Sequence, residues 1–323
     1  MLRVYFTPED LARTRISQAP QPMWELVLSL HRLRRRDDGM VFDEWRRAAL
    51  PKVPSSTRML TDLVPHFGYY ADFLTPMPTV PSVTAGVSVL LGTAKRQLRT
   101  DVATLAQARG LPSWTTNLSE GEPDTLRRLG QAVDQYFAAC LSPSWAQVRA
   151  AVDRERAQQA EMLATSGLAA VLQNLHPTAR WQYPVLEMAY PVDRELHLRG
   201  RGLHLVPSFF CLGTPTTFRD DAFEPVLVYP IRHEVGWSRT SDDASRPLAA
   251  LLGPTRAKVL EAIGESPCTT SDLARRAATT LPTASRQTAV LRQAGLISSR
   301  RDGQSVVHSL TPQGRCLLDD PAR

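Results

Sequence analysis

The stretch LPTASRQTAVLRQAGLI, residues 281–297, decides the fold of the C-terminal part of the chain. Pro282 stands where the first turn of a helix needs no backbone donor, and Gly295 stands where a left-handed residue ends a helix. Between them, apolar residues recur at intervals of three and four, the period of an amphipathic helix. The side predicted to face the core consists of Leu281, Ala284, Thr288 and Leu291.

The opposite side of this predicted helix is polar. Arginine can donate two hydrogen bonds to guanine, and glutamine can pair with the N6 and N7 edge of adenine. Each such pair discriminates between bases by about 1–3 kcal/mol. Arg286 and Gln287 therefore suit base edges in the major groove of DNA, and Thr283, near the helix start, suits a base or a phosphate.

Two further helices are predicted upstream. Residues 247–263 place apolar side chains at helical spacing, with Gly264 as the stop signal. Residues 270–277 predict a short supporting helix, in which Thr270 or Ser271 accepts a hydrogen bond from the first backbone donors.

A short basic hairpin is predicted downstream. The stretch ISSRRDGQSVVHSL, residues 297–310, alternates apolar and polar residues on either side of Asp302-Gly303, a strong hairpin signal. Three helices followed by this hairpin predict a winged helix-turn-helix over residues 248–323. The predicted DNA-binding residues are Thr283, Ser285, Arg286, Gln287, Arg300, Arg301 and Gln304.

These motifs together resemble a known family. The runs LGPTRAKVLEAI, SDLARRA, PTASRQTAVLRQAGLI and RRDGQSVVHSLTPQG are similar to ArsR/SmtB-type winged-helix regulators, with MarR-type domains a close second. The resemblance implies a homodimeric repressor whose third helix enters the major groove and whose wing touches the DNA backbone. Metal-sensing members carry a cysteine cluster at the start of the supporting helix. This chain has only Cys268 there, so we expect no metal and no other cofactor.

The positive charge is concentrated in the same segment. Residues 246–323 hold 11 Lys and Arg against 6 Asp and Glu, a net of +5, whereas the preceding 245 residues hold 27 against 26, a net of +1. Cations that displace counterions from phosphates supply the sequence-independent part of DNA affinity. The charge distribution therefore favours a DNA-binding C-terminal domain.

The rest of the chain predicts a helical body with a small sheet. Residues 1–175 contain helical patterns joined by proline-rich loops, and residues 176–235 contain short alternating strands, expected to form a small antiparallel sheet packed on that body. A hairpin turning at residues 199–202 would set His197 opposite His204, but two histidines without a third ligand make a weak metal site. The predicted fold class is α+β: mainly α with a small antiparallel β-sheet, and a C-terminal winged helix-turn-helix.

Residues 236–247 are small, polar and charged, as in a solvated linker.

Several classes of protein are disfavoured by the sequence. The sequence contains no GxSxG, HExxH or phosphate-loop motif, so an enzyme is not expected. It also lacks an apolar run of roughly 18 residues and a secretory start, which predicts a cytoplasmic location. The four cysteines lie far apart, as expected of reduced thiols.

The leading interpretation is a ligand-responsive dimeric repressor. The N-terminal region would sense a small-molecule effector and dimerise, and two winged helices would read a palindromic operator on double-stranded DNA. The alternative is a protein-interaction scaffold that uses the winged helix as a docking module. The sequence does not name an effector.

Overall fold

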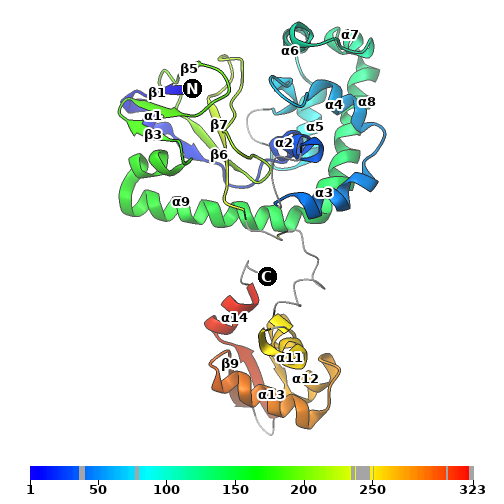
Figure 1. Cartoon of the computed structure of the whole chain (residues 1–323), viewed down its shortest axis with the longest axis vertical. Coiled ribbons are helices and arrows are strands. Elements are labelled where there is room, and N and C mark those ends of the chain that lie inside the picture. The colour runs from blue at the N-terminus through cyan, green and yellow to red at the C-terminus, as the bar shows by residue number, and fades with distance from the viewer. Residues whose placement is uncertain are drawn as a thin grey trace. The chain divides into compact units, whose positions relative to one another are not determined.

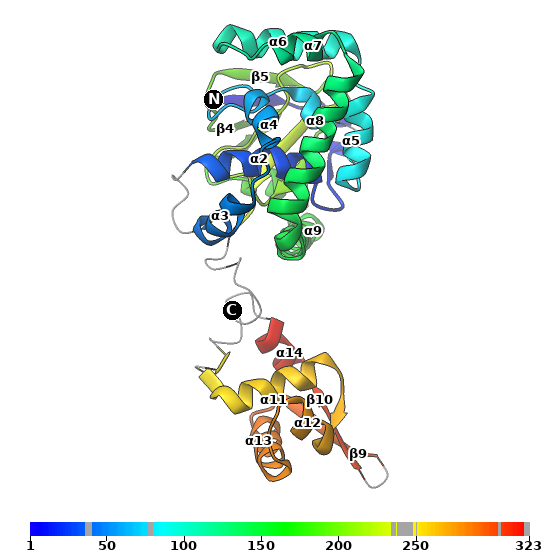
Figure 2. The same ribbon diagram turned by 90° about the vertical axis from the view of Figure 1, so that its right-hand side faces the viewer.

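The chain divides into two units, residues 1–233 and residues 234–323, in the computed structural model of the protein (Figures 1 and 2). The structure describes residues 1–35, 41–76, 80–233, 237, 248–249, 251–302 and 305–319. The predicted linker, apart from Trp237, and the wing residue Gln304 lie outside these ranges. Within them, no helix is both long enough and apolar enough to cross a membrane.

Helices dominate the N-terminal unit, as the sequence predicts. The longest of them is α9, which is interrupted by non-helical backbone at Gly167 (φ 77°), whereas residues 83–108 form two helices. The chain leaves helical geometry between Gly92 and Ala94, which ends α5 and starts α6. The helices are α1 (Pro8–Arg13), α2 (Pro22–Arg34), α3 (Asp43–Ala49), α4 (Thr57–Leu63), α5 (Val83–Leu91), α6 (Lys95–Ala108), α7 (Trp114–Ser119), α8 (Pro123–Tyr136) and α9 (Trp145–Asn174).

Two small sheets complete this unit. One has the strand order β3-β4-β1-β5 and the other the order β2-β6-β7. Antiparallel pairing joins β4 to β1 and to β3, whereas β1/β5, β2/β6 and β6/β7 are parallel. The strands are β1 (Leu2–Tyr5), β2 (Arg15–Ile16), β3 (Arg180–Gln182), β4 (Val185–Met188), β5 (Arg194–His197), β6 (His204–Ser208) and β7 (Val226–Pro230).

The prediction of a hairpin that turns at residues 199–202 is wrong. β5 and β6 belong to different sheets, because the N-terminal strands β1 and β2 pair with them and separate them. His197 is exposed and stacks on Tyr5, with ring centroids 4.4 Å apart, while His204 is buried. The two histidines therefore do not face each other as the predicted register required. The turn does use left-handed backbone at Gly200 and Gly202, at φ 80° and 75°.

One hydrophobic core cluster of the N-terminal unit joins the sheets to the end of α9. Figure 1 shows α9 running from the helical half of the unit to the strands. Its residues Val171 and Leu172 are fully buried against the alternating inward residues of β1, Leu2 and Val4. Trp24 and Trp45 of this unit are buried, and Trp114 and Trp145 are half-buried.

The C-terminal unit is a winged helix-turn-helix. Its three-stranded antiparallel sheet has the order β8-β10-β9, and its core is made of apolar residues from each helix and from β9. The elements are α11 (Pro254–Glu265), β8 (Cys268–Thr269), α12 (Thr270–Arg276), α13 (Leu281–Gln293), β9 (Ile297–Asp302), β10 (Ser305–Leu310) and α14 (Pro312–Asp319).

Three details of this unit differ from the prediction. The predicted first helix is interrupted at Gly253, which has φ +86°: residues 248–249 and 251–252 are helical before it, and α11 begins at Pro254 after it. Gly264 does not stop it but lies within it, where an added Cβ would approach Leu318 Cδ1 to 2.7 Å. The cap of α12 is Thr269, one residue earlier than expected, because Thr269 and Asp272 form a reciprocal capping box.

Candidate nucleic-acid interface

Helix α13 presents one buried and one exposed side. Ala284, Thr288 and Leu291 are 0%, 4% and 1% exposed, as predicted for the core side. Ser285 and Arg286, on the other side, are exposed. Leu281 was also predicted to face the core, but it is 51% exposed. It is the first residue of the helix, and side chains tilt toward the helix N-terminus, so Leu281 projects past the core that the later turns cover.

The start of α13 carries a hydroxyl pair. Thr280 caps the helix by accepting a hydrogen bond from the Thr283 backbone N–H at 3.4 Å, and the two side-chain hydroxyls are 2.8 Å apart. Thr283 is half-buried. Backbone donors and the helix dipole at such a terminus favour phosphate, so this position is better suited to the DNA backbone than to a base.

Gln287 already has a partner within the domain. It is half-buried, and its Oε1 accepts a hydrogen bond from Arg256 Nε of α11 at 2.9 Å. Pairing with adenine needs the same oxygen as an acceptor for the N6 amino group. Gln287 must therefore share its oxygen between Arg256 and adenine or give up the Arg256 contact, whereas the exposed Arg286 needs no such rearrangement.

The wing arginines lie on opposite faces of the hairpin. In the β9/β10 register Arg300 stands opposite Val307 and Arg301 opposite Val306, and both arginines are exposed. Successive residues of a strand point to opposite faces. Arg301 is therefore on the same face as His308, and Arg300 is on the other face.

His308 connects the wing to the supporting helix, a role the sequence analysis missed. The residue is 4% exposed, and its ring has Nδ1 at 2.8 Å from Ser299 Oγ and Nε2 at 2.9 Å from Thr270 Oγ1. Burial, and then the charge of Arg292, lower the pKa of His308. The alternation in SVVHSL predicted only which face it lies on, since its partner on α12 is a tertiary contact.

Metal-binding geometry is not found in the part of the chain that the structure describes. No group of three or more His, Cys, Asp and Glu side chains is arranged there to hold an ion. Cys268, the one cysteine near the metal position of the resembled family, is buried.

Comparison with protein families gives one match. A family model described as a helix-turn-helix domain matches residues 251–300, which run from just before α11 to within β9. No curated protein and no solved structure matches the chain. The match and the geometry of α11, α12 and α13 agree. The C-terminal unit therefore carries a helix-turn-helix domain, which supports DNA binding and transcription regulation.

Proposed function

We propose that this protein is a sequence-specific DNA-binding transcriptional regulator that acts as a ligand-responsive homodimeric repressor of the ArsR type. The observation that carries the proposal is the exposure of Ser285 and Arg286 on α13 while Ala284, Thr288 and Leu291 anchor the helix in the core. Such a helix can enter a groove without unfolding any part of its own domain.

The residues divide into two roles in this mechanism. Arg286 reads a guanine edge in the major groove, and Ser285 lies beside it on the same exposed side of α13. Arg300 and Arg301 contact phosphates, which position the protein without reading sequence. Thr283 adds a backbone contact at the start of the helix.

Dimerisation and ligand response complete the proposal. Two copies related by a two-fold axis would read half-sites of a palindromic operator roughly one helical turn apart. An effector acts through its different affinity for the DNA-competent and DNA-incompetent arrangements. We also propose a cytoplasmic location and no catalytic activity.

The test is a gel shift of the full chain with the DNA upstream of its own gene, repeated at rising salt. A DNA reader gives a specific band, and the logarithm of its affinity falls linearly with the logarithm of salt concentration. A protein-interaction scaffold gives no specific band, and that result would reject the proposal. Sedimentation of the complex measures whether two copies bind one operator.

A further inference from the structure

A cavity in the N-terminal unit is walled by four segments far apart in sequence. They are the C-terminal half of α2, the loop at residues 66–72, the loop at residues 190–194 that leads into β5, and residues 214–219. Its volume is about 370 Å³. Cavities that bind small molecules typically measure roughly 300–1,000 Å³, so this one is large enough for a one- or two-ring ligand.

The lining of this cavity is strongly cationic. The residues that line it include one carboxylate, that of Asp72, and four arginines: Arg32, Arg35, Arg194 and Arg219. The Asp72 side chain accepts hydrogen bonds from the backbone N–H groups of Arg219 and Asp220, at 3.1 and 3.2 Å. Burial, and then the nearby Asp101, raise the pKa of Asp72 to about 7. At neutral pH this carboxyl group therefore offsets only part of the positive charge.

Arg194 has a donor that lacks an acceptor. Its side chain is 17% exposed, and one terminal nitrogen donates to Asp221 Oδ1 at 2.8 Å and to the Arg219 carbonyl at 3.1 Å. Its Nε is buried and has no hydrogen-bond partner among the described residues. A buried donor without an acceptor is unfavourable, so the Arg194 side chain is not fully satisfied by its contacts within the protein.

Aromatic rings line the same cavity. They belong to Phe67, Tyr69, Tyr70 and Tyr190. The guanidinium carbon of Arg35 lies 4.6 Å from the ring centroid of Phe67, and that of Arg219 lies 5.6 Å from the ring centroid of Tyr69. Phe67 is 71% exposed, which is high for a phenylalanine, and its ring is available to pack on an apolar ligand body.

We propose that this cavity binds a small aromatic molecule bearing a carboxylate or phosphate, with Arg194 and Arg219 on the anion and the Phe67 and tyrosine rings against its aromatic body. The role of this molecule as the effector rests on the proposed function. The binding itself does not.

A hydrogen-bonded path leads from the cavity toward the second unit along the chain. The Tyr70 hydroxyl lies 3.2 Å from Thr216 Oγ1, and Thr216 exchanges two backbone hydrogen bonds with Val228 of β7, at 2.8 and 2.9 Å. The chain continues from β7 through residue 233 to the winged-helix unit. The segment 214–219 that lines the cavity is therefore hydrogen-bonded to the strand that precedes the second unit in the sequence.

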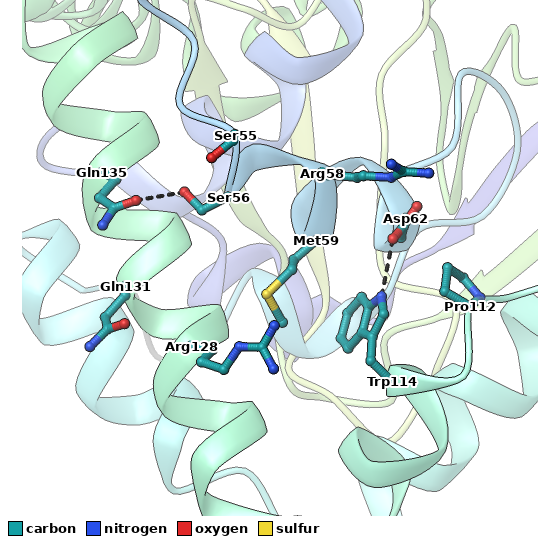
Figure 3. Close-up of a pocket in the computed structure, with 10 residues that line it drawn as sticks. All are labelled: Ser55, Ser56, Arg58, Met59, Asp62, Pro112, Trp114, Arg128, Gln131 and Gln135. Atoms are coloured by element: carbon teal, nitrogen blue, oxygen red, sulfur yellow. Dashed lines mark hydrogen bonds between the residues drawn. The ribbon is translucent and has the colours of Figure 1, made fainter.

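Titration calorimetry of the full chain tests the binding with 1-naphthoate and 1-naphthyl phosphate as probes. Neutral 1-naphthalenemethanol and inorganic phosphate serve as the uncharged and ring-free counterparts. Arg219→Gln is the informative variant, since this side chain is exposed and its backbone contact with Asp72 is kept. Arg128→Gln is the matched control. It removes an exposed arginine from a separate cavity of the same unit, of about 510 Å³, which Arg128 and Met59 both line (Figure 3).

At least one of the two naphthyl anions should bind the wild-type chain. The probe that binds more tightly shows whether the cavity prefers a carboxylate or a phosphate group. Arg219→Gln should weaken that binding by about tenfold, as expected for loss of a charge-assisted contact. Arg128→Gln should leave it within about twofold of wild type. The proposal is overturned if neither anion binds, if the neutral alcohol or inorganic phosphate binds as tightly, or if both variants lose affinity equally.

A gel shift with and without the probe separates this inference from the proposed function. If the probe binds but the protein binds no DNA, the cavity assignment stands and the proposal that the protein is a transcriptional regulator is rejected. DNA binding that a bound probe does not change rejects the effector role alone.

Discussion

Glu25 is a buried carboxyl group, and its replacement by glutamine should change how the stability of the N-terminal unit depends on pH. The side chain is 1% exposed and accepts hydrogen bonds from Ser208 Oγ at 3.0 Å and from the backbone N–H groups of Phe209 and Phe210 at 2.8 and 2.9 Å. Burial is the largest influence on this group. It raises the pKa of Glu25 from 4.5 to about 7, against the opposing effect of the three hydrogen bonds.

The sign of the effect follows from the direction of this pKa shift. Between pH 4.5 and 7 the folded chain holds a proton on Glu25 that the unfolded chain has released. This contribution to the free energy of unfolding is complete below about pH 4.5 and is lost as the pH rises through 7. At about 1.4 kcal/mol per pKa unit, the loss across this window is about 3 kcal/mol.

The Glu25→Gln variant keeps the shape of the side chain and an acceptor oxygen but cannot ionise. The free energy of unfolding of the variant, relative to wild type, should therefore rise by about 3 kcal/mol between pH 4.5 and pH 8. All other titrating groups are present in both proteins, so their contributions cancel in the difference.

Urea unfolding of the full chain, followed by tryptophan fluorescence, measures this difference, since five of the six tryptophans lie in residues 1–233. Glu161→Gln, at an exposed position of α9, is the matched control and gives the baseline against which the Glu25→Gln difference is measured. A Glu25→Gln difference that stays constant with pH would refute the reasoning. A difference that moves in favour of wild type as pH rises would show that the three hydrogen bonds hold the carboxyl group ionised.

Two further substitutions test local backbone geometry. Thr269→Ala removes the side chain that caps α12 and should lower the free energy of unfolding of the C-terminal unit by about 1 kcal/mol, measured by circular dichroism; unchanged stability would contradict the cap. Gly202→Ala should destabilise the N-terminal unit more than Gly213→Ala, measured by tryptophan fluorescence. Both glycines have positive φ, but only at 202 would the new Cβ meet another atom, the Arg13 carbonyl oxygen at 2.6 Å; equal losses would show that packing there is unimportant.

The features that could be predicted from sequence are those with a local cause. The helical period placed Ala284, Thr288 and Leu291 in the core, and a left-handed glycine, Gly295 at φ +73°, follows α13 as expected. Asp302 ends β9 and Ser305, its partner in the register, begins β10, as expected for a hairpin. In each case the signal lies within a few residues of the structure that it specifies.

The features that were missed depend on partners far away in the chain. Leu2 pairs with Met188 in the first sheet, and a strand of four residues carries no signal for a partner that distant. Distant partners also explain what was missed at the candidate DNA interface. The helical period and the polarity of the residues predicted that Gln287 points outward, but they could not reveal that Arg256, in another helix, donates a hydrogen bond to its side-chain oxygen. The cationic cavity likewise exists only because four separate segments meet.

The central claim is that α13 reads the DNA sequence, and a comparison of the Arg286→Ala and Arg301→Ala variants tests it most directly. Fluorescence anisotropy of the full chain measures the affinity of each alanine variant for the operator and for a random duplex of equal length at the same salt concentration. Arg315→Ala, at an exposed position of α14, is the control and should change neither affinity. We expect Arg286→Ala to weaken operator binding by about tenfold or more beyond its effect on random DNA. Arg301→Ala should weaken both alike. Equal losses for the two variants on both DNAs would contradict the assignment of α13 as the element that reads sequence.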